Sequence, residues 1–464
     1  MTGQRTLPSP EQPMKVARQL ESEWERNGVL TLRFWRESWM TWGGAAWSEM
    51  SAGDLKAGLY KWTENAAYIH VDGRSGVTSP RPWAPNKGKI SNLAEALAAI
   101  TNLSDDLDSG AWIDGRADTG LIIPCQNGLL ELTTRRLVPP TPEFFNVVAT
   151  PFPYLPDAPE PREWFGFLRS IWPDDPQAIE TLQEAFGYVI SGRRDLQKVF
   201  LLVGPTRSGK GTIANVLTEL VGAAHTCGPT LAQLGTNFGL APLIGKSLGI
   251  IPDARMPREV GGVVENLLMI SGQDRMTVDR KNREAWTGRL PIQLVIMSNE
   301  LPRLPDAAAA IAGRMIVLRM TRSFLGNEDR DLGRRLLIEL PGIFLWSLAG
   351  LDRLTKRGRF AEPESSIEAV DLLRETASPV GRFLDERCEL GSEFSVTTDD
   401  LFAAWRTWCA TGGRDAVGTV ETFARAMYAA APTVKRAKPR VDGRQVPTYQ
   451  GIRLRPAQPA WGAP

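Results

Sequence analysis

The chain has 464 residues, too many for one hydrophobic core, so about two to four domains are expected. Its 54 basic and 53 acidic residues nearly cancel, so overall charge does not indicate a nucleic-acid partner. No apolar run approaches the roughly 18 residues of a membrane span, and the polar, proline-containing start differs from a signal peptide, so a cytoplasmic protein without membrane contact is expected.

The sequence gives little sign of a structural metal or of disulfides. Its two histidines, His70 and His225, are far apart, and no two cysteines form a C-x-x-C pair. Buried free thiols are therefore expected rather than a zinc site or a disulfide framework. The cysteines are Cys125, Cys227, Cys388 and Cys409.

The first third of the chain is predicted to hold an α+β domain. Residues 1–15 are expected to be disordered and residues 16–150 to form the domain, with a helix from about Ser91 to Leu103 and strands after residue 120. Its tryptophans could stack on bases, but a cluster beside two glycines is more typical of a small core. They are Trp35, Trp39, Trp42 and Trp47.

An acidic loop follows that helix. Asp106 and Asp108 form a D-x-D pattern, which in a polymerase or primase would hold metal ions. Because no strand flanks the pair, a solvated acidic loop is the better interpretation, and no primase site is predicted. Residues 151–195 should then form helices that precede the central domain.

The central motif lies in KVFLLVGPTRSGKGT, residues 198–212. An apolar run over 199–203 predicts a buried strand, and a glycine-rich turn and a helix over about 210–221 follow it. Such a turn lets backbone N–H groups converge on phosphate oxygens at the positive end of the helix. The predicted nucleotide-binding residues are Gly204, Pro205, Thr206, Arg207, Ser208, Gly209, Lys210, Gly211 and Thr212.

Lys210 supplies a mobile cation for the terminal phosphates of ATP. The strict motif has Ser or Thr directly after the lysine, whereas this chain has Gly211 there. Thr212 is therefore the candidate magnesium ligand, and ATP and Mg²⁺ are the expected cofactors.

Alternating strands and helices predict a parallel sheet in a three-layer domain over residues 196–325. Further strands are expected over 246–253, 292–299 and 315–320. Polar candidates lie at or beside their ends: Asp253 as a second magnesium ligand, Asn299 as a sensor of the γ-phosphate, and Arg314 as a charge stabiliser. Ala254 and Arg255 follow Asp253, so the general base stays open among Glu259, Glu265 and Asp274.

Two basic hairpins are predicted. One lies within 277–291 and carries Arg280, Lys281 and Arg283 at its tip; the alternative is a solvated basic turn. The other ends a helix, helix, helix, hairpin order within 366–464, after a helical lid and linker over 326–365. That order, with a turn at Asp442-Gly443, is typical of a winged-helix DNA-binding domain. Its basic residues are Lys435, Arg436, Lys438, Arg440, Arg444, Arg453 and Arg455.

From about Leu121 onward, the chain resembles the helicase part of the phage/plasmid primase-helicase family, a relative of poxvirus-type primase-helicases among the superfamily III helicases of the AAA+ class. The resemblance rests on QNGLLEL, EAFGYVISG, VGPTRSGKGT, SGQDRMTVDRKNREAWTGRLP, MSNELPRL, and the tail from SPVGRFLDERC to QGIRLR. It covers about three quarters of the chain. The expected fold is therefore α/β, a P-loop AAA+ core between an α+β N-terminal region and a winged-helix domain.

The resemblance also implies residue roles. It assigns ATP binding to Gly209, Lys210 and Thr212, a Walker B role to Asp253 and a sensor role to Asn299. It further implies a DNA-contacting hairpin around Lys281, and an Arg314 that acts on the neighbouring subunit of a hexameric ring moving 3′ to 5′ along one DNA strand. The usual N-terminal primase domain is not recognised, which leaves open a separate primase as partner.

The main hypothesis is an ATP-driven replicative DNA helicase of a phage, satellite or plasmid. It would bind single-stranded DNA and, through its winged helix, an origin duplex. A second hypothesis is a replication initiator in which ATP switches assembly without processive unwinding. A small-molecule P-loop kinase is the weakest alternative, because it leaves both basic hairpins unexplained.

Overall fold

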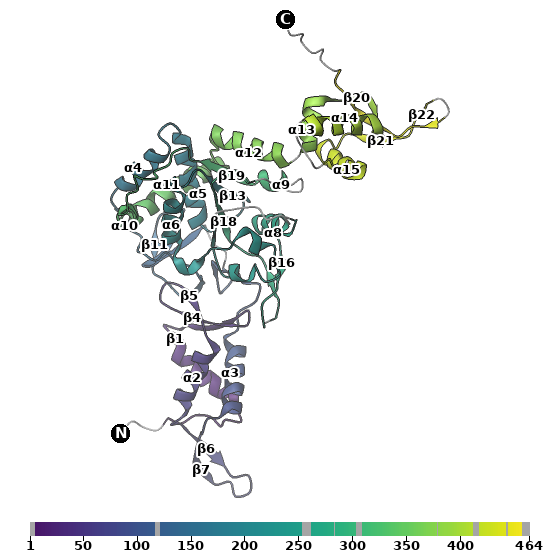
Figure 1. The fold of residues 1–464 in the computed structure, drawn as a ribbon. Helices are drawn as coiled ribbons and strands as arrows, with labels where there is room; N and C mark the ends of the chain where they lie inside the picture. The colour runs from purple at the N-terminus through teal and green to yellow at the C-terminus, as the bar shows by residue number, and fades with distance from the viewer. Residues whose placement is uncertain are drawn as a thin grey trace.

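The computed structural model describes residues 5–116, 121–252, 261–282, 284–302, 309–377, 379–411, 417–441 and 444–456. Figure 1 shows an N-terminal module at the bottom, a central sheet with its helices, and a C-terminal module at the upper right. Among the helices of these ranges, none is both long enough and apolar enough to cross a bilayer.

The N-terminal module (residues 5–116) is built around three helices, α1 (Pro13–Glu21), α2 (Ala52–Thr63) and α3 (Lys87–Thr101), whose apolar faces share one core. A three-stranded antiparallel sheet, β3-β4-β5, adjoins them, and β6 and β7 form a separate hairpin. The strands are β1 (Glu25–Arg26), β2 (Val29–Leu30), β3 (Leu32–Trp35), β4 (Ser38–Trp42), β5 (Trp47–Met50), β6 (Ala67–Val71), β7 (Thr78–Pro82) and β8 (Ala111–Trp112).

Two details of this module differ from the sequence-based expectation. Residues 5–15 are not free chain: Leu7 is 3% exposed, its N–H donates to the Ala67 carbonyl, and α1 begins at Pro13. Helix α3 begins at Lys87 instead of Ser91, because the Asn86 side chain accepts a hydrogen bond from the Lys89 N–H and so caps the helix earlier.

The tryptophan cluster is a core, as the sequence favoured. Trp39, Trp42 and Trp47 are at most 9% exposed. Trp35 is half-buried, and its indole N–H donates to the Leu107 carbonyl. Next to it in the chain, Arg36 forms an ion pair with Asp108, and this contact holds the acidic loop against the N-terminal module.

A short antiparallel sheet and two helices lead into the centre. The sheet pairs β9 (Ile122–Cys125), β10 (Gly128–Glu131) and β11 (Leu137–Val138), while β12 (Phe144–Phe145) pairs with β8 of the N-terminal module. Helices α4 (Arg162–Ile171) and α5 (Pro176–Ile190) follow. Pro176 in the first turn and the Asp175 carboxylate, which accepts from the Ala178 N–H, start α5.

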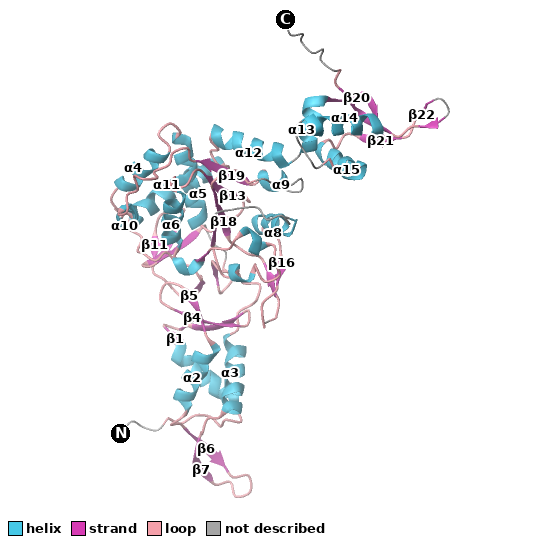
Figure 2. Cartoon of the chain, in the orientation of Figure 1, coloured by secondary structure: helices cyan, strands magenta, loops and turns pink. Residues whose placement is uncertain are grey.

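The centre is a five-stranded parallel sheet in the order β14-β15-β18-β13-β19, with helices on both faces, as Figure 2 shows. Its strands are β13 (Val199–Val203), β14 (Thr226–Cys227), β15 (Leu248–Ile251), β18 (Gln293–Ser298) and β19 (Met315–Arg319). The sheet is compatible with a P-loop core. Its helices are α6 (Lys210–Val221), α7 (Leu231–Leu234), α8 (Gly261–Gly272) and α9 (Ala309–Ala312), and the hairpin β16 (Met276–Val278) and β17 (Trp286–Gly288) precedes β18.

Successive side chains of β13 point alternately into two hydrophobic cores, one on each face of the sheet. Phe200 and Leu202 pack with residues of α4, α5, α6 and α11 (Leu340–Arg357), whereas Leu201 faces residues of α7, α8 and α12 (Glu364–Ala377). Such an alternation is what a strand buried on both faces produces. Helix α10 (Leu332–Ile338) precedes α11.

Helix α12 packs on the edge strand of this sheet, although the sequence suggested that a new domain begins near residue 366. The Val317 N–H of β19 donates to the Ser366 hydroxyl, and Leu373 is buried in the core of the sheet. An edge strand leaves backbone groups unpaired, and Ser366 satisfies one of them.

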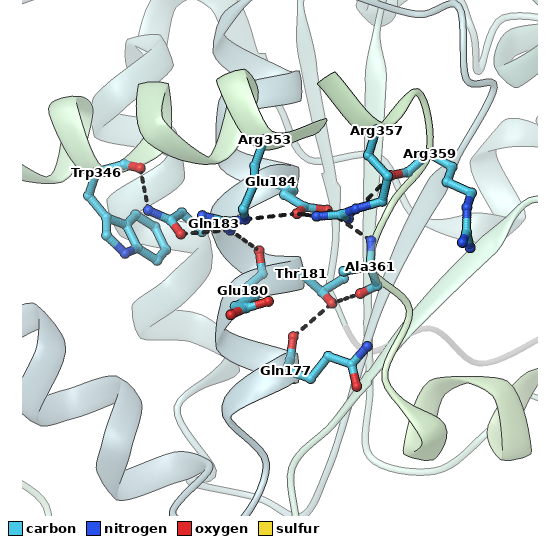
Figure 3. Close-up of polar contacts among 10 residues, drawn as sticks. All are labelled: Gln177, Glu180, Thr181, Gln183, Glu184, Trp346, Arg353, Arg357, Arg359 and Ala361. Atoms are coloured by element: carbon cyan, nitrogen blue, oxygen red, sulfur yellow. Dashed lines mark hydrogen bonds and ion pairs between the residues drawn. The ribbon is translucent and has the colours of Figure 1, made fainter. Parts of the chain in front are cut away.

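A buried carboxylate joins the helices of one face. Glu184 of α5 is fully buried and accepts hydrogen bonds from Arg353 and Arg357 of α11 and from the Ala361 N–H, as Figure 3 shows. The Arg357 Nη2 to Glu184 Oε1 distance is 2.8 Å. One residue therefore fixes α5, α11 and the segment that leads to α12.

The C-terminal module places three helices on a three-stranded antiparallel sheet, β20-β24-β21, around one aromatic core. A smaller hairpin, β22 and β23, projects from it in Figure 1. The long first strand was not predicted. The elements are α13 (Pro379–Arg387), β20 (Cys388–Thr397), α14 (Thr398–Thr411), α15 (Val420–Ala430), β21 (Lys435–Ala437), β22 (Arg440–Val441), β23 (Arg444–Gln445) and β24 (Thr448–Leu454).

Candidate functional site

The glycine-rich turn, hereafter the P-loop (residues 204–212), joins β13 to α6 at the carboxyl edge of the parallel sheet. Gly209 caps α6 with φ 99°, and a Cβ there would lie 2.8 Å from Ile171 Cδ1. A Cβ on Gly204 would lie 2.6 Å from the Met320 carbonyl oxygen. Both positions therefore require glycine, because backbone and neighbouring side chains approach too closely for any other residue.

Lys210 is the first residue of α6, and its ammonium group folds back over the loop. Nζ lies 2.8 Å from the Pro205 carbonyl oxygen and 3.2 Å from Ser208 Oγ, and it also donates to the Gly204 carbonyl. The cation thus lies beside the start of a helix whose first N–H groups have no partner within the helix. The positive end of α6 and Lys210 together form an environment suited to an anion.

Gly211 and Thr212 occupy the first turn of α6. A Cβ on Gly211 would meet no atom within 4 Å, so no steric reason excludes the Ser or Thr of the strict motif. Thr212 is half-buried. Its hydroxyl remains the candidate magnesium ligand on this helix.

The sheet brings Asn299 to the same edge as the P-loop. Ser298, the last residue of β18, is the register partner of Val203, and its carbonyl accepts from the Gly204 N–H at 3.2 Å. Asn299 follows directly and is exposed. Asp253 lies outside the described residues, as does Glu259; β15 ends two residues before Asp253, at Ile251.

Arg314 lies at the amino ends of the parallel strands, at the side of the sheet opposite the P-loop. It precedes β19, and Met315 pairs with Val199 while Arg319 pairs with Val203, so the strand separates Arg314 from the P-loop. Five residues of parallel strand span roughly 16 Å, too far for contact with the phosphates of its own subunit. Its Nη1 donates instead to the Leu268 carbonyl at 2.7 Å and to Ser271 Oγ at 2.9 Å, at the end of α8.

The remaining candidates for a general base lie on or after α8. Glu265 is exposed on that helix. Asp274 lies beside Arg314, since its Oδ2 and the Arg314 Nη1 are respectively 3.0 and 3.1 Å from a Cβ built on Gly272. Asp274 therefore lies near the edge that carries Arg314.

The first basic hairpin is present, as predicted. Strands β16 and β17 pair from Met276 to Gly288, and Thr277 and Thr287 share a hydrogen bond across it at 3.1 Å. At the tip, Arg280 donates to the Glu284 carbonyl and Lys281 is exposed. Arg283 lies outside the described residues.

The second basic surface is the ribbon of the C-terminal module, here called the basic arm (residues 435–445). Within the described part of the chain, its basic side chains are exposed and none forms an ion pair with a described carboxylate: Lys435, Arg436, Lys438, Arg440 and Arg444. Two other residues of the predicted stripe have structural partners. Arg453 pairs with Glu389 and stacks on Phe394, and Arg455 donates to the Cys388 carbonyl.

The cysteines match the expectation of buried thiols. Cys125, Cys388 and Cys409 are buried and Cys227 is half-buried, all unbridged. Burial raises the pKa of the Cys125 and Cys227 thiols to about 11 and that of Cys388 to about 12, so these three are neutral at pH 7. Among the described residues, no group of three metal-ligating side chains is assembled.

One contact of the P-loop had no signal in the sequence. The segment after β19 lies against the loop: the Ser323 hydroxyl donates to the Thr206 carbonyl at 2.8 Å and the Phe324 N–H donates to the Arg207 carbonyl at 2.9 Å. Neither residue belongs to a motif, so only the fold reveals the contact.

Comparison with known proteins gives two family matches and a shared fold. Residues 35–173 match a family described as D5 N terminal like, and residues 202–314, which contain the P-loop, match a family of unknown function, DUF5906.

Two solved structures are similar along nearly the whole chain. One is "The apo structure of NrS-1 C terminal region (305-718)", with TM-score 0.53 and 13% identity over 95% of this chain and 99% of that one. The other is "The A form apo structure of NrS-1 C terminal region-CTR", with TM-score 0.52, 14% identity and the same coverage. The chain therefore shares the fold of the NrS-1 C-terminal region, and its P-loop lies within the DUF5906 match.

Proposed function

We propose that the protein is an ATP-dependent DNA helicase that acts in the replication of a phage or another mobile element. The observation that carries the proposal is the P-loop itself, with Lys210 at the start of α6 and two positions, Gly204 and Gly209, where a side chain would collide with Met320 or Ile171 packed against the loop. The match to the D5 N terminal like family and the fold shared with the NrS-1 C-terminal region support the assignment.

The residues present fit a nucleoside triphosphate. The loop amides and Lys210 would hold the phosphates, and Thr212 with Asp253 would hold Mg²⁺, which when bound neutralises charge on the phosphates. Asn299 lies at the carboxyl edge of the sheet with the P-loop and would sense the terminal phosphate or orient the attacking water. The general base stays open.

Two basic surfaces support DNA as the partner. Lys281 at the tip of the β16–β17 hairpin is exposed, and the basic arm carries five exposed cations without a described ion pair. Such side chains contact phosphates and give affinity without base specificity. We assign the hairpin to single-stranded DNA and the C-terminal module to duplex DNA, as a winged-helix domain.

We further propose a ring of subunits, six by analogy with superfamily III helicases. Arg314 cannot reach the P-loop of its own chain, so a role in hydrolysis requires a neighbour's nucleotide. It would have to leave the Leu268 carbonyl and Ser271 to do so. Head-to-tail contacts of this kind close into rings.

The alternative is a replication initiator in which ATP switches assembly. The residues after Asp253, Ala254 and Arg255, favour it, because they supply no second carboxylate for rapid hydrolysis. The exposed basic arm suits duplex binding in either case. The two functions differ in whether DNA accelerates hydrolysis.

The test is ATP hydrolysis with and without single-stranded DNA. For the helicase, DNA should stimulate the wild-type rate, and Lys210→Ala should lower it roughly 100-fold. Lys281→Ala should reduce the stimulation and lower the salt slope of DNA binding by about one, while Lys56→Ala, an exposed lysine of the N-terminal module, serves as the matched control. Hydrolysis that DNA leaves unchanged would favour the initiator.

A further inference from the structure

The segment that leaves β19, here called the strap (residues 320–328), runs beside the P-loop. At its start, the Met320 N–H donates to the Val203 carbonyl at 2.7 Å. Further along, Ser323 Oγ donates to the Thr206 carbonyl at 2.8 Å and the Phe324 N–H to the Arg207 carbonyl at 2.9 Å. The strap thus binds the outer side of two consecutive P-loop peptides.

These contacts fix the direction in which two P-loop N–H groups point. In a planar trans peptide, the carbonyl of one residue and the N–H of the next point in opposite directions. Because the Thr206 and Arg207 carbonyls face the strap, the N–H groups of Arg207 and Ser208 face away from it. Within the described part of the chain, neither N–H donates a hydrogen bond to protein.

Arg207 adopts a conformation that needs such support. Its φ is 61°, in the left-handed region that side chains other than glycine rarely occupy. The two hydrogen bonds from the strap hold Arg207 in this conformation, because one binds the Thr206 carbonyl directly before it and the other binds its own carbonyl. The ion pair of Arg207 with Glu328 adds little, since it spans 3.5 Å and the Arg207 side chain is 63% exposed.

The far end of the strap is anchored as well. Asp329, the next residue, accepts from the Leu332 N–H at the start of α10 and pairs with Arg335 at 2.6 Å. Arg335 also pairs with Glu163 of α4, the helix whose Ile171 lies against Gly209. The strap is therefore a fixed segment between the sheet and the helices that flank the P-loop.

We propose that the strap positions the nucleotide site, with Ser323 as its positioning side chain. Because the strap binds the Thr206 and Arg207 carbonyls, the Arg207 and Ser208 amides are presented to the β-phosphate of a nucleoside di- or triphosphate. This inference rests on the proposed nucleotide-binding function. The strap acts on phosphate binding and not on the chemistry of transfer, so its loss should change affinity and KM but leave kcat unaltered.

The test compares Ser323→Thr, which keeps the hydroxyl, with Ser323→Val, which has the same shape without it. ADP binding to the full chain is measured by calorimetry, together with the unfolding midpoint without nucleotide. We expect Ser323→Val to bind ADP roughly three- to tenfold more weakly than Ser323→Thr, with equal midpoints. Ser392→Ala, an exposed serine of the C-terminal module, should match the wild type.

The outcomes separate this inference from the proposed function. If the wild type binds ADP, Lys210→Ala does not, and Ser323→Val binds as tightly as Ser323→Thr, the strap has no positioning role and the inference is overturned. If the two variants unfold at different midpoints in proportion to their affinity, Ser323 serves stability alone, which also overturns it. A wild type that binds no ADP contradicts the proposed function, and the inference with it.

Discussion

At the scale of single residues, three glycines of one loop have different reasons to be there. A Cβ on Gly204 or Gly209 would collide with Met320 or Ile171, whereas one on Gly211 would meet open space. The first two are demanded by the fold. Gly211 is allowed by the fold but not required, so the missing hydroxyl after Lys210 is a chemical feature of this protein.

This difference predicts opposite effects of the same substitution. Gly211→Ala should stabilise the protein by about 0.5–1 kcal/mol, because alanine favours a helix and the position is open. Gly209→Ala should destabilise it by about 1 kcal/mol or more, because of the φ of 99° and the contact with Ile171. Urea unfolding of the two variants measures both changes. Equal destabilisation would contradict the geometry of the loop.

At the scale of elements, Glu184 holds α5, α11 and the segment before α12 together. Removing the Glu184 carboxylate leaves the Ala361 N–H without its partner and leaves two arginines that are 37% and 28% exposed without their ion pair, so Glu184→Ala should lower the free energy of unfolding by about 1–3 kcal/mol. Glu180→Ala changes an exposed carboxylate one turn away on the same helix and is expected to cost less than about 0.5 kcal/mol.

Urea unfolding of the two variants side by side measures this contrast. A loss of similar size in both would mean that the network in Figure 3 does not stabilise the fold through the charge of Glu184.

The sequence predicts local elements well where a strong pattern and a cap coincide. The strand 199–203 and the helix 210–221 lie where the apolar run and the P-loop indicate, and both basic hairpins form. Helix α3 begins earlier than expected because Asn86 caps it. The strand β20 was missed because its sequence, CELGSEFSVT, has no continuous apolar run and because only one of its residues is buried.

The arrangement of the site depends on the fold and could be predicted only in part. That Asn299 joins the P-loop follows from parallel strands, whose carboxyl ends meet at one edge. That Ser323 and Phe324 bind the loop does not, because backbone carbonyls have no sequence signature. The position of Arg314 on the far edge follows from its place before β19, but its hydrogen bonds with α8 do not.

At the scale of the whole molecule, the location of Arg314 makes the proposed ring testable by mixing subunits. Lys210→Ala and Arg314→Ala should each abolish hydrolysis if a site combines Lys210 of one subunit with Arg314 of the next. In an equal mixture, about a quarter of such heterologous interfaces would carry both intact residues, so about a quarter of the wild-type rate should return.

In the control, each variant is taken through the same mixing procedure with more of the same variant, and it should stay inactive. A mixture no more active than its components would contradict a site shared between subunits. If Arg314→Ala alone hydrolyses ATP at the wild-type rate, Arg314 has no role in hydrolysis and serves only to bind the end of α8.

The most direct test of the proposed function is strand displacement on a forked duplex with a 3′ single-stranded tail, with and without ATP. We expect the wild type to unwind the duplex only with ATP and Lys210→Ala not to unwind it. DNA binding and ATP hydrolysis without displacement would contradict the helicase and favour the initiator, and a protein that binds no DNA at all would contradict both.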